Sequence, residues 1–86
     1  MNYRMEKYLR TAQRKNRTLI FNSLKGTCIA LDEGSYKIVK YIMNKFPTGE
    51  QLENFAKDMN VSEASLHKFL DCLKEKGFLY EDIKNN

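Results

Sequence analysis

The hydrophobic pattern of this chain changes its period once, near residue 32. Before that point the apolar residues stand in short runs rich in β-branched and aromatic side chains, which is typical of strands. After it they recur at i, i+3, i+4 and i+7, which is typical of amphipathic helices. Strands followed by helices predict the α+β class. A chain of 86 residues is long enough for a single domain, whose ordered core we expect at about residues 8–80.

Three short strands are expected in the first third of the chain, at residues 8–13, 18–22 and 27–31. The connections between them are short, so they favour a three-stranded antiparallel sheet. In the third strand, alternation places Ile29 and Leu31 on one face and Cys28 and Ala30 on the other. In the second strand we expect Leu19 and Phe21 to lie on the buried face.

Three helices are expected in the remainder, each between a capping residue and a residue that ends helices. The expected N-caps are Asp32, Thr48 and Ser62. The expected end signals are Pro47, Asn60 and Gly77. Gln51 stands where a capping box requires it. The residues expected on the apolar side of the first helix are Tyr36, Ile38, Val39, Ile42, Met43 and Phe46.

The two ends of the chain carry weaker signals. Residues 78–80 predict a short extended segment that returns after the last helix. Residues 81–86 are expected to fray. Residues 1–7 are charged and lack a following apolar run, so they do not form a signal peptide. No apolar stretch approaches the length of a membrane helix.

Positive charge is concentrated at the N-terminal end. Residues 1–26 hold seven Lys and Arg against one acid, whereas residues 27–86 have a net charge of −2. An anionic partner is therefore expected first at the strands. Cys28 and Cys72 are too far apart in the sequence to form a disulfide framework or a metal-ligand pattern, and a reducing, cytoplasmic setting follows.

The residues that carry catalytic chemistry are sparse. His67 is the only imidazole, and no sequence pattern supplies it with a nucleophile and an orienting group. Cys28 and Cys72 are interpreted as small buried apolar residues. The glycines are scattered and do not form a phosphate-binding loop. We therefore expect no enzyme, no catalytic residue, no metal site and no cofactor.

Residues 52–73 have the pattern of a helix-turn-helix, and the extended segment after them suggests the winged variant. Modules of this kind bind DNA in some proteins and protein in others. The candidate recognition helix at 62–76 has no net charge and contains no Arg, Asn or Gln. These charges argue against nucleic acid as the partner, although a DNA-binding regulator stays open as an alternative.

Peptide binding is the second possibility that the pattern leaves open. A three-stranded sheet has two open edges, and an edge beside a helix accepts an extended peptide as an additional strand. The third strand and the third helix are the expected walls, with Lys68 and Lys76 at a rim that suits an acidic peptide. Ile29 and Phe69 are core residues by default. A dimerising domain that pairs its open edge with a second copy also stays open.

Four segments in this order resemble a known family: LIFNSLKGT at 19–27, IALDE at 29–33, PTGEQL at 47–52 and FLDCLKEKGFL at 69–79. The chain resembles the recognition elements that bind precursor peptides in the maturation of ribosomally synthesised peptides. The prototype of that family is protein D of pyrroloquinoline quinone biosynthesis. The resemblance covers residues 8–80, and residues 1–7 have no part in it.

The resemblance implies a noncatalytic winged helix-turn-helix that binds the leader of a precursor peptide and presents it to a modifying enzyme, of the radical S-adenosylmethionine type. It implies that the leader adds antiparallel to the third strand and packs against the third helix. The residues implied on the strand are Thr27, Cys28, Ile29, Ala30 and Leu31. Those implied on the helix are Ser65, Lys68, Phe69, Cys72 and Lys76. Whether the chain is free-standing or part of such an enzyme stays open.

Overall fold

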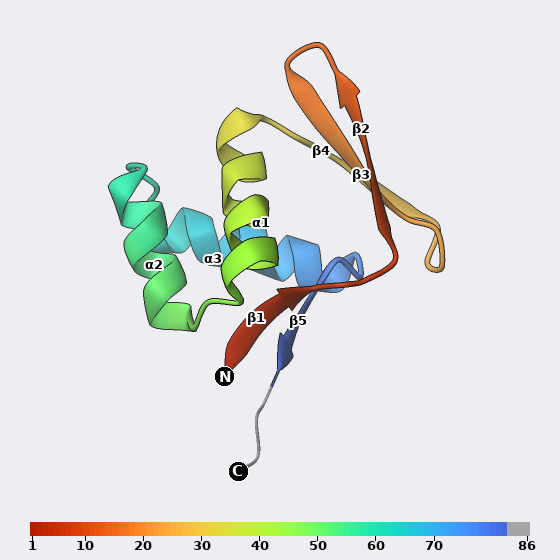
Figure 1. Cartoon of the computed structure of the whole chain (residues 1–86). Coiled ribbons are helices and arrows are strands. Elements are labelled where there is room, and N and C mark those ends of the chain that lie inside the picture. The colour runs from red at the N-terminus through yellow and green to blue at the C-terminus, as the bar shows by residue number, and fades with distance from the viewer. Residues whose placement is uncertain (83–86) are drawn as a thin grey trace.

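The structure is a computed structural model, and it describes residues 1–82 (Figure 1). Over these residues the chain forms five strands and three helices. In chain order they are β1 (Asn2–Met5), β2 (Leu9–Arg14), β3 (Arg17–Asn22), β4 (Thr27–Leu31), α1 (Glu33–Lys45), α2 (Gly49–Asp58), α3 (Glu63–Glu75) and β5 (Leu79–Asp82). The α+β class, the three expected strands and the three expected helices are confirmed.

The strands form two antiparallel sheets rather than one. The expected sheet has the order β2-β3-β4, and β1 pairs with β5 in a second sheet of two strands. The second sheet was not predicted, because β1 lies outside the expected core of 8–80 and the segment 81–86 was expected to fray. Glu81 and Asp82 instead pair with β1, and residues 83–86 lie outside the described residues.

Side-chain alternation explains why β1 is a strand. Tyr3 and Met5 point into the core and are buried, whereas Asn2 and Arg4 between them are half-buried. Arg4 Nε lies 2.6 Å from Asp82 Oδ2 across the pair. The backbone amide of Tyr3 also donates to the carbonyl of Pro47, which joins β1 to the turn after α1. Residues 2–6 therefore belong to the fold.

The predicted buried face of β3 is wrong by one residue. Ile20 is 1% exposed and lies between two buried polar side chains, Thr18 and Asn22, whereas Leu19 and Phe21 are half-buried on the opposite face. A shift of one residue moves every side chain of a strand to the other face. Because residues 19–21 are all apolar, alternation alone does not decide the face. In β4 the prediction for Leu31 and Ile29 is consistent with the burial, which is full for Leu31 and partial for Ile29.

The helix boundaries follow the expected capping residues. The side chains of Asp32, Thr48 and Ser62 accept hydrogen bonds from the third amide that follows each of them, and Gln51 completes the capping box. Phe46 ends α1 in the left-handed region with a φ of 46°, directly before Pro47. Asn60 and Gly77 also have positive φ angles, of 62° and 82°. The local signals for starting and stopping helices are therefore confirmed.

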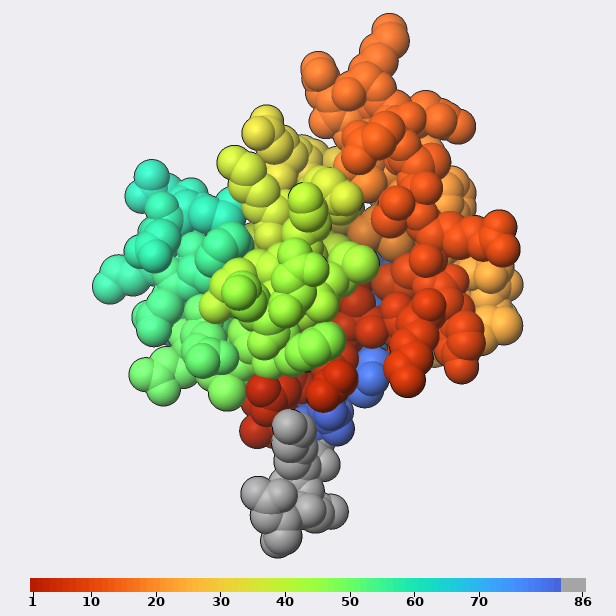
Figure 2. Space-filling model, viewed as in Figure 1, coloured from red at the N-terminus to blue at the C-terminus, as the bar shows by residue number. Residues whose placement is uncertain are grey.

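The core lies between the three-stranded sheet, the helices and the β1–β5 pair. Its fully buried members include Ile20, Leu31, Ile38, Val39, Ile42, Leu52, Leu66, Leu70, Leu73 and Phe78. Three residues expected on the apolar side of α1 are not among them: Tyr36 is half-buried, Met43 is 46% exposed and Phe46 is 43% exposed. In Figure 1 the sheet stands on one side of α1, α2 on the other, and α3 runs behind α1. The hairpin of β2 and β3 stands out beyond the helices in Figure 2.

No helix in the described part of the chain is both long enough and apolar enough to cross a membrane.

Candidate functional site

The edge of the three-stranded sheet at β4 has no strand beside it. The sheet order places β3 on one side of β4 only, and no described residue pairs with its other side. In an antiparallel sheet, alternate backbone N–H and C=O groups of an edge strand point away from its neighbour. The edge of β4 therefore carries the hydrogen-bonding groups that an added strand requires.

The helix α3 runs beside β4 in the opposite direction. At one end, the hydroxyl of Thr27 in β4 donates to the carbonyl of Lys76, the C-cap of α3, at 2.8 Å. At the other end, Asp32 directly after β4 lines a pocket together with Ser65 and Phe69 of α3. From residue 27 to 32 a strand covers about 17 Å, and from residue 65 to 76 a helix covers about 17 Å. The two elements therefore match in length between these two points.

A small pocket marks the far end of this arrangement, where β4 passes into α1. Its volume is about 250 Å³, and its walls are mostly apolar. The residues that line it are Asp32, Gly34, Ser35, Ile38, Val61, Ser65, Leu66 and Phe69. We call it the α1–α3 pocket, and its size suits one large apolar side chain.

A carboxylate lies at the edge of the α1–α3 pocket. Asp32 Oδ1 accepts a hydrogen bond of 2.8 Å from the backbone amide of Ser35, and this bond lowers the pKa of Asp32. Asp32 is therefore ionised at neutral pH. Lys68 is exposed at the pocket end of α3, between the pocket-lining residues Ser65 and Phe69, and Lys76 is exposed at the other end of the helix. The end of the strand edge that lies away from Asp32 therefore has a positive charge from Lys76.

The residues predicted on α3 fall into two groups. Ser65, Phe69, Cys72 and Lys76 follow a spacing of four, three and four residues, so they share one side of the helix. Phe69 and Cys72 are half-buried, whereas Ser65 is exposed. Lys68 is exposed at the margin of this stripe and lines none of the described pockets.

The residues predicted on β4 divide between its two faces. Thr27 and Ile29 are half-buried and Leu31 is buried on the side of the core. Cys28 and Ala30 are exposed on the opposite face of the sheet. The interpretation of Cys28 as a buried apolar residue is therefore wrong, and Cys72 is only partly buried. The accessible feature on this side of the strand is therefore its backbone edge rather than a set of side chains.

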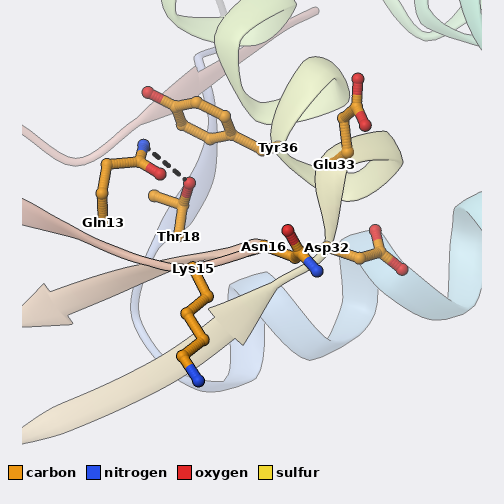
Figure 3. Close-up of a pocket in the computed structure, with 7 residues that line it drawn as sticks. All are labelled: Gln13, Lys15, Asn16, Thr18, Asp32, Glu33 and Tyr36. Carbon is orange, nitrogen blue, oxygen red and sulfur yellow. Dashed lines mark hydrogen bonds between the residues drawn. The ribbon is translucent and has the colours of Figure 1, made fainter.

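The second described pocket near β4 is polar and lies on the other side of Asp32 (Figure 3). It lies between the β2–β3 hairpin and the start of α1, with a volume of about 570 Å³. Gln13 and Thr18 are joined there by a hydrogen bond of 3.0 Å and face the ring of Tyr36. None of the residues proposed from the sequence lines this pocket.

The single histidine is part of a surface contact. His67 Nε2 lies 3.0 Å from Glu53 Oε2, which connects α3 to α2. The imidazole is exposed and does not line the α1–α3 pocket. Its role in the described structure is to link two helices.

The sequence interpretation missed most of the α1–α3 pocket. Ile38 was assigned to the apolar side of the first helix, and Val61 and Leu66 fell within the helix-turn-helix expected at 52–73. Their positions along the chain do not show that these residues meet. The turn between α2 and α3 gave one usable signal, since Val61 is an apolar residue between two polar neighbours. It points toward the core side of the turn and reaches the pocket.

Comparison with family models, with curated proteins and with solved structures gave no match to this chain.

Proposed function

We propose that this chain binds the leader region of a ribosomally synthesised precursor peptide by strand addition at the free edge of β4. In this proposal the leader runs antiparallel to β4 and packs against the stripe of α3 that contains Ser65, Phe69, Cys72 and Lys76. The protein does no chemistry itself. It presents the leader to a modifying enzyme, for which we propose a radical S-adenosylmethionine maturase, in the cytoplasm.

One observation carries the proposal: α3 reaches both ends of β4, whose outer edge is unpaired, and the two elements have matching lengths between these points. The Thr27–Lys76 hydrogen bond holds them together at one end, and the α1–α3 pocket opens at the other. Peptides that add to a sheet edge obtain affinity from backbone hydrogen bonds and selectivity from side-chain pockets. Both requirements are met by neighbouring parts of this surface.

The charges define the kind of leader that fits. A strand antiparallel to β4 begins beside Leu31 and ends beside Thr27. Its first residues therefore lie near the α1–α3 pocket, the ionised Asp32 and Lys68, and its last residues lie near Lys76. We propose a leader with an apolar anchor at its N-terminal side and acidic residues that reach Lys68 and Lys76.

The arrangement of the helices leads to a more detailed proposal about the fold. We propose that α2 and α3 are the helices of a winged helix-turn-helix, with the β1–β5 pair beside them. In such a module α3 is the helix available for recognition. Here its exposed positions include Glu63, Asp71 and Glu75, which repel phosphates and favour a peptide over DNA.

The test is a titration of ¹⁵N-labelled protein with the leader of the precursor peptide encoded beside its gene. We expect the largest amide shifts at residues 27–31 and 63–76. Shifts confined to other residues would overturn the proposal. Saturable, steeply salt-dependent binding of duplex DNA through α3 would favour the DNA-binding regulator instead. Pairing of β4 edges in a concentration-dependent dimer would favour the dimerising domain.

Two pairs of matched variants make the titration specific. Ser65→Trp fills the α1–α3 pocket, whereas Ala64→Trp places the same ring on the neighbouring exposed position, which does not line the pocket. We expect only Ser65→Trp to weaken leader binding, by about tenfold or more. Lys68→Glu should weaken an acidic leader by about three- to tenfold, and Lys57→Glu on α2 should not. Equal effects within either pair would remove that residue from the site.

A further inference from the structure

The three-stranded sheet has a second face that no described helix covers. Strand register places Ala12, Leu19 and Ala30 in one row across this face. The next row contains Arg10, Phe21 and Cys28. Arg14 and Arg17 face each other at the hairpin end. We call these eight residues the outer sheet face.

The centre of the outer sheet face is apolar and recessed. Leu19, Phe21 and Ala12 are half-buried, although no described helix covers them. A shallow depression of about 580 Å³ lies at the hairpin end of this face, with Leu19 and Ala30 at its base and Arg14 and Arg17 at its rim. The outer sheet face therefore offers an apolar floor inside a basic border.

Most of the border has no counter-charge among the described residues. Residues 9–31 contain five Lys and Arg and no Asp or Glu. Among the described residues, Arg10, Arg14 and Lys15 form no ion pair, and the Arg14 guanidinium donates only to the carbonyl of Gln13. Arg17 is partly engaged, since its charge contributes to lowering the pKa of Asp32. Most of the positive charge on this face is available to a partner.

We propose that the outer sheet face is a second docking surface, which binds an acidic, amphipathic segment of a partner protein. Apolar side chains of the segment cover Leu19, Ala12 and Ala30, and its carboxylates pair with Arg10 and Arg14. Guanidinium groups bind carboxylates with two parallel hydrogen bonds, so arginines at a border give both affinity and orientation. The proposal does not depend on leader binding, because it uses a face of the sheet rather than its edge.

The composition of the face distinguishes this partner from nucleic acid. Proteins that bind single strands on a sheet stack successive bases on several aromatic rings. The outer sheet face has one aromatic side chain, Phe21, and its ring is half-buried. Its floor is made of aliphatic and small side chains, which pack better against aliphatic side chains than against bases.

The charge also excludes a second copy of the same face as the occupant. A twofold dimer brings identical patches together, and here it would place two arginine clusters against each other. Like charges in contact disfavour such an interface. With an acidic partner this repulsion is absent, and the arginines of the border attract the partner instead.

The experiment is an NMR titration with peptides that separate charge from hydrophobicity. The probe is an amphipathic peptide of Glu and Leu, compared with a peptide of Glu and Gln and a peptide of Lys and Leu. We expect the Glu–Leu peptide to shift amides of residues 10–14, 17–21 and 28–30, and to bind about tenfold more tightly than the Glu–Gln peptide. The Lys–Leu peptide should leave these amides unchanged.

Variants of the chain provide the second half of the test. Arg10→Glu with Arg14→Glu should weaken the Glu–Leu peptide by about tenfold or more, whereas Lys40→Glu with Lys57→Glu on the helices should not. Leu19→Thr, which replaces an apolar side chain with a polar one of high strand propensity, should weaken binding of the Glu–Leu peptide with the charges intact. The proposal is overturned if oligo(dT) or phosphatidylserine vesicles perturb the same amides more strongly than the peptide does. It is also overturned if the peptide perturbs only the edge of β4 and α3, a result that leaves the proposed leader site standing.

Discussion

Asn22 is the buried polar side chain that connects the sheet to the end of α3. It is 3% exposed, its Nδ2 donates to the carbonyl of Gly77 at 2.6 Å, and its Oδ1 accepts from the amides of Leu24 and Lys25. Asn22→Ala should lower the free energy of unfolding by about 2–3 kcal/mol, because it removes three hydrogen bonds and leaves a buried carbonyl unpaired. Urea denaturation measures the loss. Asn44→Ala, at an exposed position in α1, should be close to neutral.

The face of β3 gives a second test at a single residue. Ile20→Ala should cost about 2–4 kcal/mol, because Ile20 is fully buried, whereas Leu19→Ala on the outer sheet face should cost about 1 kcal/mol or less. Thermal and urea unfolding of both variants would rank them. If Leu19→Ala were the more damaging change, the face assigned to Ile20 would be wrong.

The buried face of β3 also shows a limit of prediction from the sequence. Residues 19–21 are apolar without interruption, so the local pattern fits either face. The deciding contact is the hydrogen bond from Asn22 to Gly77, and its partners are 55 residues apart. The sequence of one strand contains no signal for a partner at such a distance along the chain.

At the scale of elements, two glycines that end turns differ in their surroundings. Gly26 and Gly77 both have positive φ angles, of 69° and 82°. A Cβ at Gly26 would meet nothing, whereas one at Gly77 would overlap the side chain of Lys25 and press on Asn22 Nδ2. Gly26→Ala should therefore cost about 1–2 kcal/mol from the backbone alone, and Gly77→Ala about 1 kcal/mol more. Chemical denaturation compares the two, and equal losses would contradict the close packing at Gly77.

Helices and their ends were predictable because their signals are local. Asp32, Thr48 and Ser62 each bind an amide three residues away, so the sequence contains both partners side by side. The pair of β1 and β5 was not predictable, since Asn2 and Asp82 pair across nearly the whole chain. The candidate site also has a part that was predictable from the sequence and a part that was not. The edge strand and the helix stripe follow from periodicity, whereas the α1–α3 pocket depends on how α1, α3 and the turn between α2 and α3 assemble.

At the scale of the whole molecule, an ion pair ties α3 to the β1–β5 sheet. Lys74 Nζ lies 2.5 Å from Glu81 Oε1 and 5.4 Å from the centre of the Tyr3 ring. The hydrogen bond from Lys74 lowers the pKa of Glu81, and the same bond raises the pKa of Lys74. Because folding lowers the pKa of Glu81, the ionised carboxylate stabilises the folded protein. This stabilisation is complete at pH values above the ordinary pKa of 4.5, and it is lost as the pH falls through the folded-state pKa.

Glu81→Gln should therefore destabilise the protein at pH 7 and reduce the loss of stability on acidification below about pH 4.5. Urea midpoints measured at several pH values from neutral to acidic provide the comparison. Glu75→Gln, at an exposed position in the last turn of α3, is the matched control and should keep the pH dependence of the unchanged chain. A Glu81→Gln protein with that same dependence would show that the pair with Lys74 does not stabilise the fold.

The pairing of β1 with β5 also determines how this protein responds to mechanical force. Asn2 and Asp82 face each other at the same end of an antiparallel pair, where β1 begins and β5 ends (Figure 1). A load applied between these two residues acts along the interstrand hydrogen bonds and not along the strands, because those bonds are perpendicular to the strands. The hydrogen bonds then break one after another, starting at the loaded end. Tyr3 leaves the core early because it is next to Asn2. The three-stranded sheet, with the free edge of β4, bears none of this load until the β1–β5 pair has separated.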